Sequence, residues 1–270
     1  MLLSNFEYVP LRLLRRFLLS DSLLLRFGEL FPYYKTNLNQ ADPGRLVNDY
    51  QRLLAAVDFS PRSRRILEIG VGRTNSTAYE MAARFDPGAV ISFEPYVPFA
   101  IREDGKLLAA LASKHACDPK KIAANVSRLT ELKTVPDGSI DLVLSSSVLE
   151  HVTDPPSLFR ELARVLTPNG AMLHVVDYRD HFFKYPYHFL QFSKATWNRW
   201  LNPGDIPVWR LYDHLEQLSA TAFAVNVVEK SNDRPAYSAI AKYVSSDYRR
   251  DDERLQITRA ALWARKGTAS

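Results

Sequence analysis

Two glycines and two glutamates are the residues of this chain whose types and spacing point most directly to chemistry. Gly70 and Gly72 follow the apolar segment 65–69. Without side chains they let the backbone bend sharply and a ligand approach closely. Glu94 closes the next apolar segment about twenty residues later, where a carboxylate accepts hydrogen bonds from the hydroxyls of a ribose. The spacing therefore predicts a site for an adenosine-containing cofactor.

Glu68 lies inside the first apolar segment and helps to separate two kinds of adenosine cofactor. Dinucleotide sites carry a third glycine across the turn so that a pyrophosphate meets the helix N-terminus, but here that position is Asn75. A carboxylate close to the turn instead attracts a cofactor with a positive sulfonium. The residues favour S-adenosylmethionine over a nicotinamide dinucleotide, and an NAD-dependent oxidoreductase is the alternative enzyme.

Segments typical of strands and of helices alternate from residue 64 to about residue 176. Asp154 followed by Pro155 is a typical helix start, because a proline at the first helical position needs no amide partner. The alternation predicts a doubly wound α/β sheet, mostly parallel, with helices on both faces. The expected strands are 65–69, 89–93, 122–126, 140–145 and 171–176, followed by an antiparallel pair at 223–228 and 236–244.

Two longer segments carry a resemblance to a known family. They are PDGSIDLVLSSSVLEHV at 136–152 and FRELARVLTPNG at 159–170. Together with the glycine turn before them, they resemble the class I S-adenosylmethionine-dependent methyltransferases of the small-molecule type. The resemblance implies a Rossmann-like, seven-stranded sheet and a site in which Glu94 holds the ribose hydroxyls. It also implies that further cofactor contacts come from Glu68, Gly70, Gly72, Ser145 and Ser146.

The chain departs from the family pattern at two places. Thr74 stands where many members of the family have a further glycine. The acid that usually meets the adenine amino group has no clear counterpart between Asn125 and Glu131. We therefore expect the backbone near Leu129 to contact the adenine instead.

The loop after the last parallel strand supplies candidates for acid–base chemistry. Asp177 and His181 follow the strand at the carboxyl edge of the sheet, where ligands bind in such folds. Methyl transfer to an oxygen needs a base near the acceptor hydroxyl, and we predict that His181 is that base, with Asp177 beside it. The alternative is a loop histidine hydrogen-bonded to Asp180 or Asp177 without a catalytic duty. One histidine and two acids in a single loop are too few to predict a metal site.

An insertion at 178–210 is rich in aromatic side chains, among them Trp197, Trp200 and Trp209. Aromatic faces stack on sugar rings, although they also cover the edges of cores. The insertion resembles one found in methyltransferases of surface-polysaccharide pathways, which implies an aromatic acceptor cap and a sugar hydroxyl as the methyl acceptor. Arg210 is a candidate ligand for an acceptor phosphate.

The N-terminal residues 1–60 form an expected helical extension before the methyltransferase domain at 61–245. Leu11, Leu14, Phe17 and Leu18 share one face of a predicted helix, and the arginines between them share the other. Such a helix serves as a lid over the cofactor or lies on an anionic membrane near a lipid-linked acceptor. The charge-rich residues 246–270 predict a C-terminal surface helix or tail.

Composition limits the remaining possibilities. With 270 residues, 46% of them hydrophobic and 24% charged, the chain suits one large globular domain with extensions. Cys117 is the only cysteine, which fits a cytoplasmic protein without disulfides. The net charge of +5 is scattered among acids, so we expect no nucleic-acid partner. A catalytically inactive protein that binds S-adenosylmethionine for regulation remains the alternative outside catalysis.

Overall fold

The computed structural model describes residues 2–18, 42–180, 185–202, 207–221, 223–249 and 251–266. The chain divides into two compact units, and each is described by itself. The sheet unit comprises Leu38–Val176, Leu215–Glu229 and Ala261–Ser270. The aromatic unit comprises Met1–Asn37, Asp177–His214 and Lys230–Ala260.

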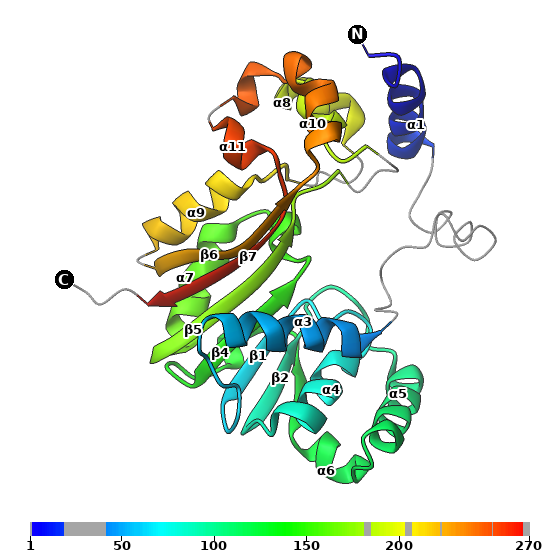
Figure 1. Cartoon of the computed structure of the whole chain (residues 1–270). Coiled ribbons are helices and arrows are strands. Elements are labelled where there is room, and N and C mark those ends of the chain that lie inside the picture. Colours follow the sequence, from blue (N-terminus) through cyan, green and yellow to red (C-terminus); the bar gives the residue numbers. More distant parts are fainter. Residues whose placement is uncertain are drawn as a thin grey trace. The chain divides into compact units, whose positions relative to one another are not determined.

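The strands form one seven-stranded sheet in the order β3-β2-β1-β4-β5-β7-β6 (Figure 1). Strands β3, β2, β1, β4 and β5 pair in parallel, so their carboxyl ends meet at one edge. The expected doubly wound, mostly parallel α/β fold is therefore confirmed. The strands are β1 (Arg65–Ile69), β2 (Ala89–Phe93), β3 (Val126–Leu129), β4 (Ile140–Ser146), β5 (Leu166–Asp177), β6 (Phe223–Asn232) and β7 (Ile257–Lys266).

Helices cover both faces of this sheet. Apolar side chains of α3 and α4 pack with Ile66, Val90 and Leu173 in one buried core. α7 covers the opposite face, because its Phe159 lies 6.4 Å, between ring centroids, from His174, which alternates with Leu173 along β5. The helices associated with the sheet are α3 (Pro43–Ala56), α4 (Ser76–Phe85), α5 (Ile101–Lys114), α6 (Pro119–Ala124), α7 (Pro155–Val165) and α9 (Leu211–Ala220).

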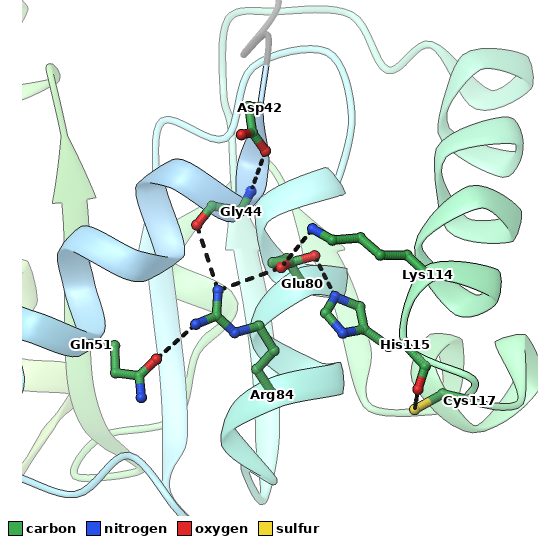
Figure 2. A network of polar contacts seen from close by, with 8 residues as sticks. All are labelled: Asp42, Gly44, Gln51, Glu80, Arg84, Lys114, His115 and Cys117. Carbon is green, nitrogen blue, oxygen red and sulfur yellow. Dashed lines mark hydrogen bonds and ion pairs between the residues drawn. The ribbon is translucent and has the colours of Figure 1, made fainter.

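A buried carboxylate ties α3 to α4 and to the end of α5 (Figure 2). The Glu80 side chain is buried, accepts a hydrogen bond from Lys114 Nζ at 3.2 Å and lies 2.8 Å from His115 Nε2. Arg84 extends the network to α3, since it donates to Gln51 Oε1 at 2.7 Å. Burial raises the pKa of Glu80, but hydrogen bonds from His115 and Lys114 lower it overall. The network holds α3 in place over the strands that carry the candidate site.

Aromatic side chains form the core of the aromatic unit. Tyr187, Phe189, Trp197 and Tyr248 are all buried there. Among the helices of the described ranges, none is both long and apolar enough to cross a lipid bilayer. The unit contains α1 (Asn5–Phe17), α8 (Lys194–Thr196), a π-helical turn (Trp197–Leu201), α10 (Arg234–Ile240) and α11 (Asp252–Leu255).

Arg210 lies inside this core and not at a ligand site. Its side chain is fully buried, and its guanidinium donates to the backbone carbonyls of Tyr178, Leu255 and Ile257. Burial lowers its pKa. The expectation that Arg210 binds an acceptor phosphate is therefore wrong, because the guanidinium joins separate backbone segments out of reach of solvent.

Two of the expected strands are wholly or partly helical. Residues 122–126 divide between the end of α6 and the start of β3, and most of 236–244 belongs to α10 and the short 3₁₀ turn after it. Asp118 and Asp233 cap these helices, since each side chain accepts a hydrogen bond from a backbone amide of the first turn. A proline within the first two positions of each helix supports the same start. These N-terminal signals outweigh a weak strand pattern.

The expected boundaries of the N- and C-terminal extensions also differ from the structure. The predicted surface helix or tail at 246–270 is wrong for residues 257–266, because β7 is a buried strand between β5 and β6. Its apolar run at 260–264 is typical of a strand covered on both faces, but charged residues on either side obscure it. The expected extension 1–60 divides between the two units, with α1 in the aromatic unit and α3 in the sheet unit.

Candidate cofactor site

The turn between β1 and α4 has the sharp bend that its glycines predict. Gly70 has a φ of +75° and Gly72 a φ of +69°, in the left-handed region that strains other residues. A Cβ atom on Gly70 would lie 2.4 Å from Cγ2 of Val148. Both the conformation and the closeness of Val148 therefore require glycine at position 70.

Replacing Gly70 with alanine should destabilise the protein by about 2 kcal/mol, because the new methyl group must displace Val148 and adopt a left-handed conformation. Gly105→Ala is the matched control: nothing lies within 4 Å of a Cβ there, and the residue is inside helix α5. Alanine at 105 should raise the stability by up to about 1 kcal/mol. Denaturant unfolding compares the two variants. A Gly70→Ala variant as stable as the wild type would mean that the turn adjusts without strain.

The Glu94 carboxylate lies against the glycine turn, where its spacing placed it. Oε2 accepts from the Gly72 amide at 3.0 Å, and Oε1 accepts from the amides of Tyr96 and Val97 at 3.0 and 3.2 Å. A carboxylate accepts about four hydrogen bonds. The three amide bonds therefore leave one acceptor position, on Oε2. Glu94 thus orders the turn and keeps the capacity to accept from one further donor.

Arg128 and Asp104 hold the same turn from neighbouring elements. Arg128 donates to the Gly72 carbonyl at 2.6 Å and to Asn75 Oδ1 at 3.2 Å. Asp104 accepts from the Asn75 amide at 2.6 Å, and the Phe99 ring lies 4.9 Å from the Arg128 guanidinium carbon. Burial lowers the pKa of Arg128, and the nearby carboxylates partly offset that effect. Sequence reasoning missed both residues, because no local pattern links them to the turn.

Glu68 is buried together with two other polar side chains. It pairs in register with Ser92 of β2, and Tyr50 of α3 lies near enough for burial and Glu68 together to raise the Tyr50 pKa. All three residues are at most 2% exposed. Glu68 Oε2, the Tyr50 hydroxyl and Ser92 Oγ have no hydrogen-bond partner among the described residues. Burial raises the pKa of Glu68 to about 8, so this carboxyl is mostly protonated at neutral pH.

The predicted contacts from β4 point to opposite faces of the sheet. Ser145 is fully buried, and its Oγ lies 2.7 Å from Nδ1 of His174, on the α7 side. Ser146 is half-buried on the same face as Glu68, because it alternates with Ser145 and Glu68 pairs in register with Leu144. The Ser145 side chain is thus engaged away from the glycine turn, whereas Ser146 remains on the face of Glu68.

The predicted adenine contact lies at the end of β3. The Leu129 carbonyl accepts from the Glu94 amide at 3.1 Å, which brings the two strand ends together. That carbonyl is part of the sheet ladder, so a contact to adenine needs its second lone pair or a neighbouring amide. Around the turn the structure therefore brings together Gly70, Gly72, Glu94 and Leu129, with Glu68 two residues before Gly70.

The predicted acid–base residues are described only in part. His181 lies outside the described residues. Asp177 ends β5 in the aromatic unit, and its carboxylate accepts from the Arg179 guanidinium, from Nε at 2.9 Å and from Nη2 at 2.6 Å. Asp180 is held in the same unit by Tyr8 and Arg12. Both described carboxylates of this loop are therefore bound to side chains of their own unit.

Part of the sequence matches known proteins. Residues 67–174 match the family model described as a methyltransferase domain. An uncharacterized methyltransferase from Mycolicibacterium gilvum (strain PYR-GCK) is 31% identical over 139 residues. That alignment covers 51% of this chain and 47% of the relative, so the chain spans about half the length of the curated relative that it matches.

Solved structures share the fold. An N-methyltransferase of Haemonchus contortus, bound to phosphomonomethylethanolamine and S-adenosylhomocysteine, is 19% identical with a TM-score of 0.54, and the match covers 95% of this chain and 60% of that one. A protein of Galdieria sulphuraria described as a sarcosine dimethylglycine methyltransferase is 15% identical with a TM-score of 0.51, over 82% and 86% of the two chains. At such identities the similarity establishes the fold alone. Residues 67–174 are thus similar to a methyltransferase domain, and the sheet unit has the fold of the solved methyltransferases.

Proposed function

We propose that this chain transfers the methyl group of S-adenosylmethionine to a hydroxyl group of a sugar acceptor. The proposal that the chain binds S-adenosylmethionine rests on two acceptors at the glycine turn. Buried Glu68 has a carboxyl oxygen without a hydrogen-bond partner among the described residues. Glu94 retains one acceptor position. These acceptors match the charge of a sulfonium nucleoside and the hydroxyls of its ribose. The residues present therefore fit the cofactor that the domain type requires.

Each residue of the turn has a separate task in this proposal. Glu94 accepts one ribose hydroxyl through Oε2, because Oε1 already accepts two amide bonds. Gly70 lets the turn bend against Val148, Gly72 lets the methionine end of the cofactor approach the backbone, and the ionised form of Glu68 favours its positive charge. Ser146 stands on the same face of the sheet, and the backbone near Leu129 contacts the adenine. Ser145 contributes through its backbone only, since its side chain is bonded to His174.

Support for a sugar acceptor comes from an open groove in the aromatic unit. Trp197, Trp209, Tyr248 and Lys194 are among its lining residues. Trp209 is the partly exposed ring among these three aromatic residues, and a face of this kind stacks on the apolar face of a sugar ring. Trp197 Nε1 and the Tyr248 hydroxyl are buried without a hydrogen-bond partner among the described residues, so small movements of the groove would give sugar hydroxyls two polar groups to bind.

The reaction that we propose is a single displacement. The acceptor oxygen bonds to the methyl carbon, the carbon–sulfur bond breaks, and its electron pair stays on sulfur to leave S-adenosylhomocysteine. The hydroxyl proton passes to His181, with Asp177 as an electrostatic partner. Alignment of the two reactants and exclusion of water supply the rest of the rate enhancement. We further infer a cytoplasmic enzyme whose acceptor is lipid-linked.

Labelled S-adenosylmethionine tests the function directly. The full chain is incubated with it and with nucleotide sugars or polyprenyl-linked sugars, and label in the sugar supports the proposal. Phosphomonomethylethanolamine, the ligand of the Haemonchus relative, serves as the comparison for transfer to nitrogen. Binding of S-adenosylhomocysteine without turnover on any hydroxyl would instead identify an inactive cofactor-binding protein. For the base, His181→Ala should slow turnover while S-adenosylhomocysteine binding stays intact.

A further inference from the structure

Helix α1 packs against the aromatic unit through a mixed face, on which Val9 and Leu13 contact the aromatic core beside buried polar side chains. Asn5, Tyr8 and Arg12 are at most 5% exposed. The Tyr8 hydroxyl and the Arg12 guanidinium both donate to the Asp180 carboxylate, and Asn5 Nδ2 donates to Gln191 Oε1 at 3.0 Å. These buried polar contacts fix which side of the helix points inward, because leaving any of the groups unpaired would be costly.

The opposite side of α1 is apolar and exposed. Its side chains follow one another at helical spacing along a single stripe, so α1 leaves this second apolar stripe exposed. Glu7, at the margin of the stripe, accepts a hydrogen bond from Tyr185 at 2.5 Å. The exposed residues and their exposed fractions are Leu3 85%, Phe6 71%, Leu14 39%, Phe17 57% and Leu18 70%.

The stripe continues onto a second element of the same unit. Trp200 of the π-helical turn is 46% exposed, and its ring lies 6.3 Å from the Phe17 ring between centroids. The exposed Arg199 places its guanidinium carbon 5.0 Å from the Trp200 ring centre. Leucine, phenylalanine and tryptophan next to cations are the side chains that suit the boundary between lipid headgroups and acyl chains.

We propose that this surface, the α1 face, binds an anionic lipid surface. The α1 face consists of Leu3, Phe6, Leu14, Phe17, Leu18 and Trp200, with Arg199 at its margin. The apolar side chains enter the boundary between headgroups and acyl chains, and the Arg199 guanidinium contacts lipid phosphates. The net charge of +5 favours the same partner. A stripe one helix wide is narrow for a stable dimer of this chain. The inference does not rest on the proposed methyl transfer.

Sedimentation of the full chain with vesicles tests the α1 face. We expect binding to phosphatidylcholine vesicles that contain phosphatidylglycerol, weaker binding to phosphatidylcholine alone, and a loss of binding at high salt. The double variant Phe6→Ser/Phe17→Ser should bind at least about tenfold more weakly without a change in melting temperature, because both side chains are exposed. Arg199→Gln should weaken binding to the anionic vesicles only. Ile101→Ser, which changes a 72% exposed residue of α5, is the control and should bind like the wild type.

Three results would overturn this inference. One is a wild-type chain that stays in the supernatant with both kinds of vesicle. Another is a double variant that binds vesicles as well as the wild type does. The third is a wild-type chain that binds no lipid but forms a concentration-dependent dimer in sedimentation velocity, while the double variant stays monomeric. The α1 face would then bind a second copy of the chain.

Discussion

Glu94→Ala should weaken the binding of S-adenosylhomocysteine by about 100-fold or more. The alanine removes the acceptor that we assign to a ribose hydroxyl and also releases the amides of Gly72, Tyr96 and Val97 from the carboxylate. A hydrogen bond to a charged group contributes about 1.5–3 kcal/mol, so the loss of the ribose bond alone approaches a factor of 100. The freed amides add to the loss, because the turn must then be ordered by the ligand. Calorimetric titration of the two proteins measures the difference.

Two further variants show whether the affinity is lost at the Glu94 carboxylate or through a general disturbance of the protein. Asp137→Ala removes an exposed carboxylate paired with Arg164 just before β4, at the opposite edge of the sheet, and should bind like the wild type. Glu94→Gln keeps one carbonyl acceptor but places an amide group among backbone donors, so it should fall between the wild type and Glu94→Ala. If Glu94→Ala gives the same heat and affinity as the wild type, Glu94 is not part of the site.

The parts of the site that sequence reasoning predicted are those whose signal is local. Gly70 and Gly72 stand next to the strand that they terminate, and Glu94 ends the following strand, so a parallel sheet must bring them to one edge. The same holds for the order of the elements from β1 to β5. These features depend on neighbours in sequence and on one rule of topology.

The parts that were missed depend on contacts between distant residues. Arg128 reaches the turn only because β3 lies beside β2, and Tyr50 approaches Glu68 only because α3 packs on that face. The family resemblance implied a cofactor contact from Ser145, but one step of strand alternation turns its side chain toward His174. For β7, the obstacle was composition, because charges on both sides hid a short buried run. Hydrophobic periodicity and helix-capping patterns contain no information about which distant residues will contact one another.

Glu68 should make the stability of the cofactor-free protein fall as the pH rises. Its pKa is about 8 in the folded chain against 4.5 for an ordinary glutamate, because burial disfavours the carboxylate. Between these two values the folded state holds a proton that the unfolded state has lost, so each pH unit lowers the stability by up to about 1.4 kcal/mol. The loss is complete above pH 8 and amounts to about 4–5 kcal/mol as an upper bound.

Glu68→Gln isolates this effect, because the amide has nearly the same shape and no charge to bury. The variant and the wild type should have similar unfolding free energies near about pH 4.5, and the variant should be the more stable one at about pH 8.5. Denaturant titrations at several pH values measure the difference. If the unfolding free energies of the two proteins change with pH in the same way, the pKa of Glu68 is not raised in the folded protein.

Cofactor binding should reverse the protonation of Glu68. A sulfonium beside the carboxyl favours its ionised form, so S-adenosylmethionine should release up to one proton per site at neutral pH, and S-adenosylhomocysteine, which lacks that charge, should release less. Titration calorimetry in buffers of different ionisation enthalpy counts the released protons. The Glu68→Gln variant should show no such difference between the two ligands. Equal proton release by both ligands in the wild type would place the sulfonium away from Glu68 and leave its buried carboxyl with a purely structural role.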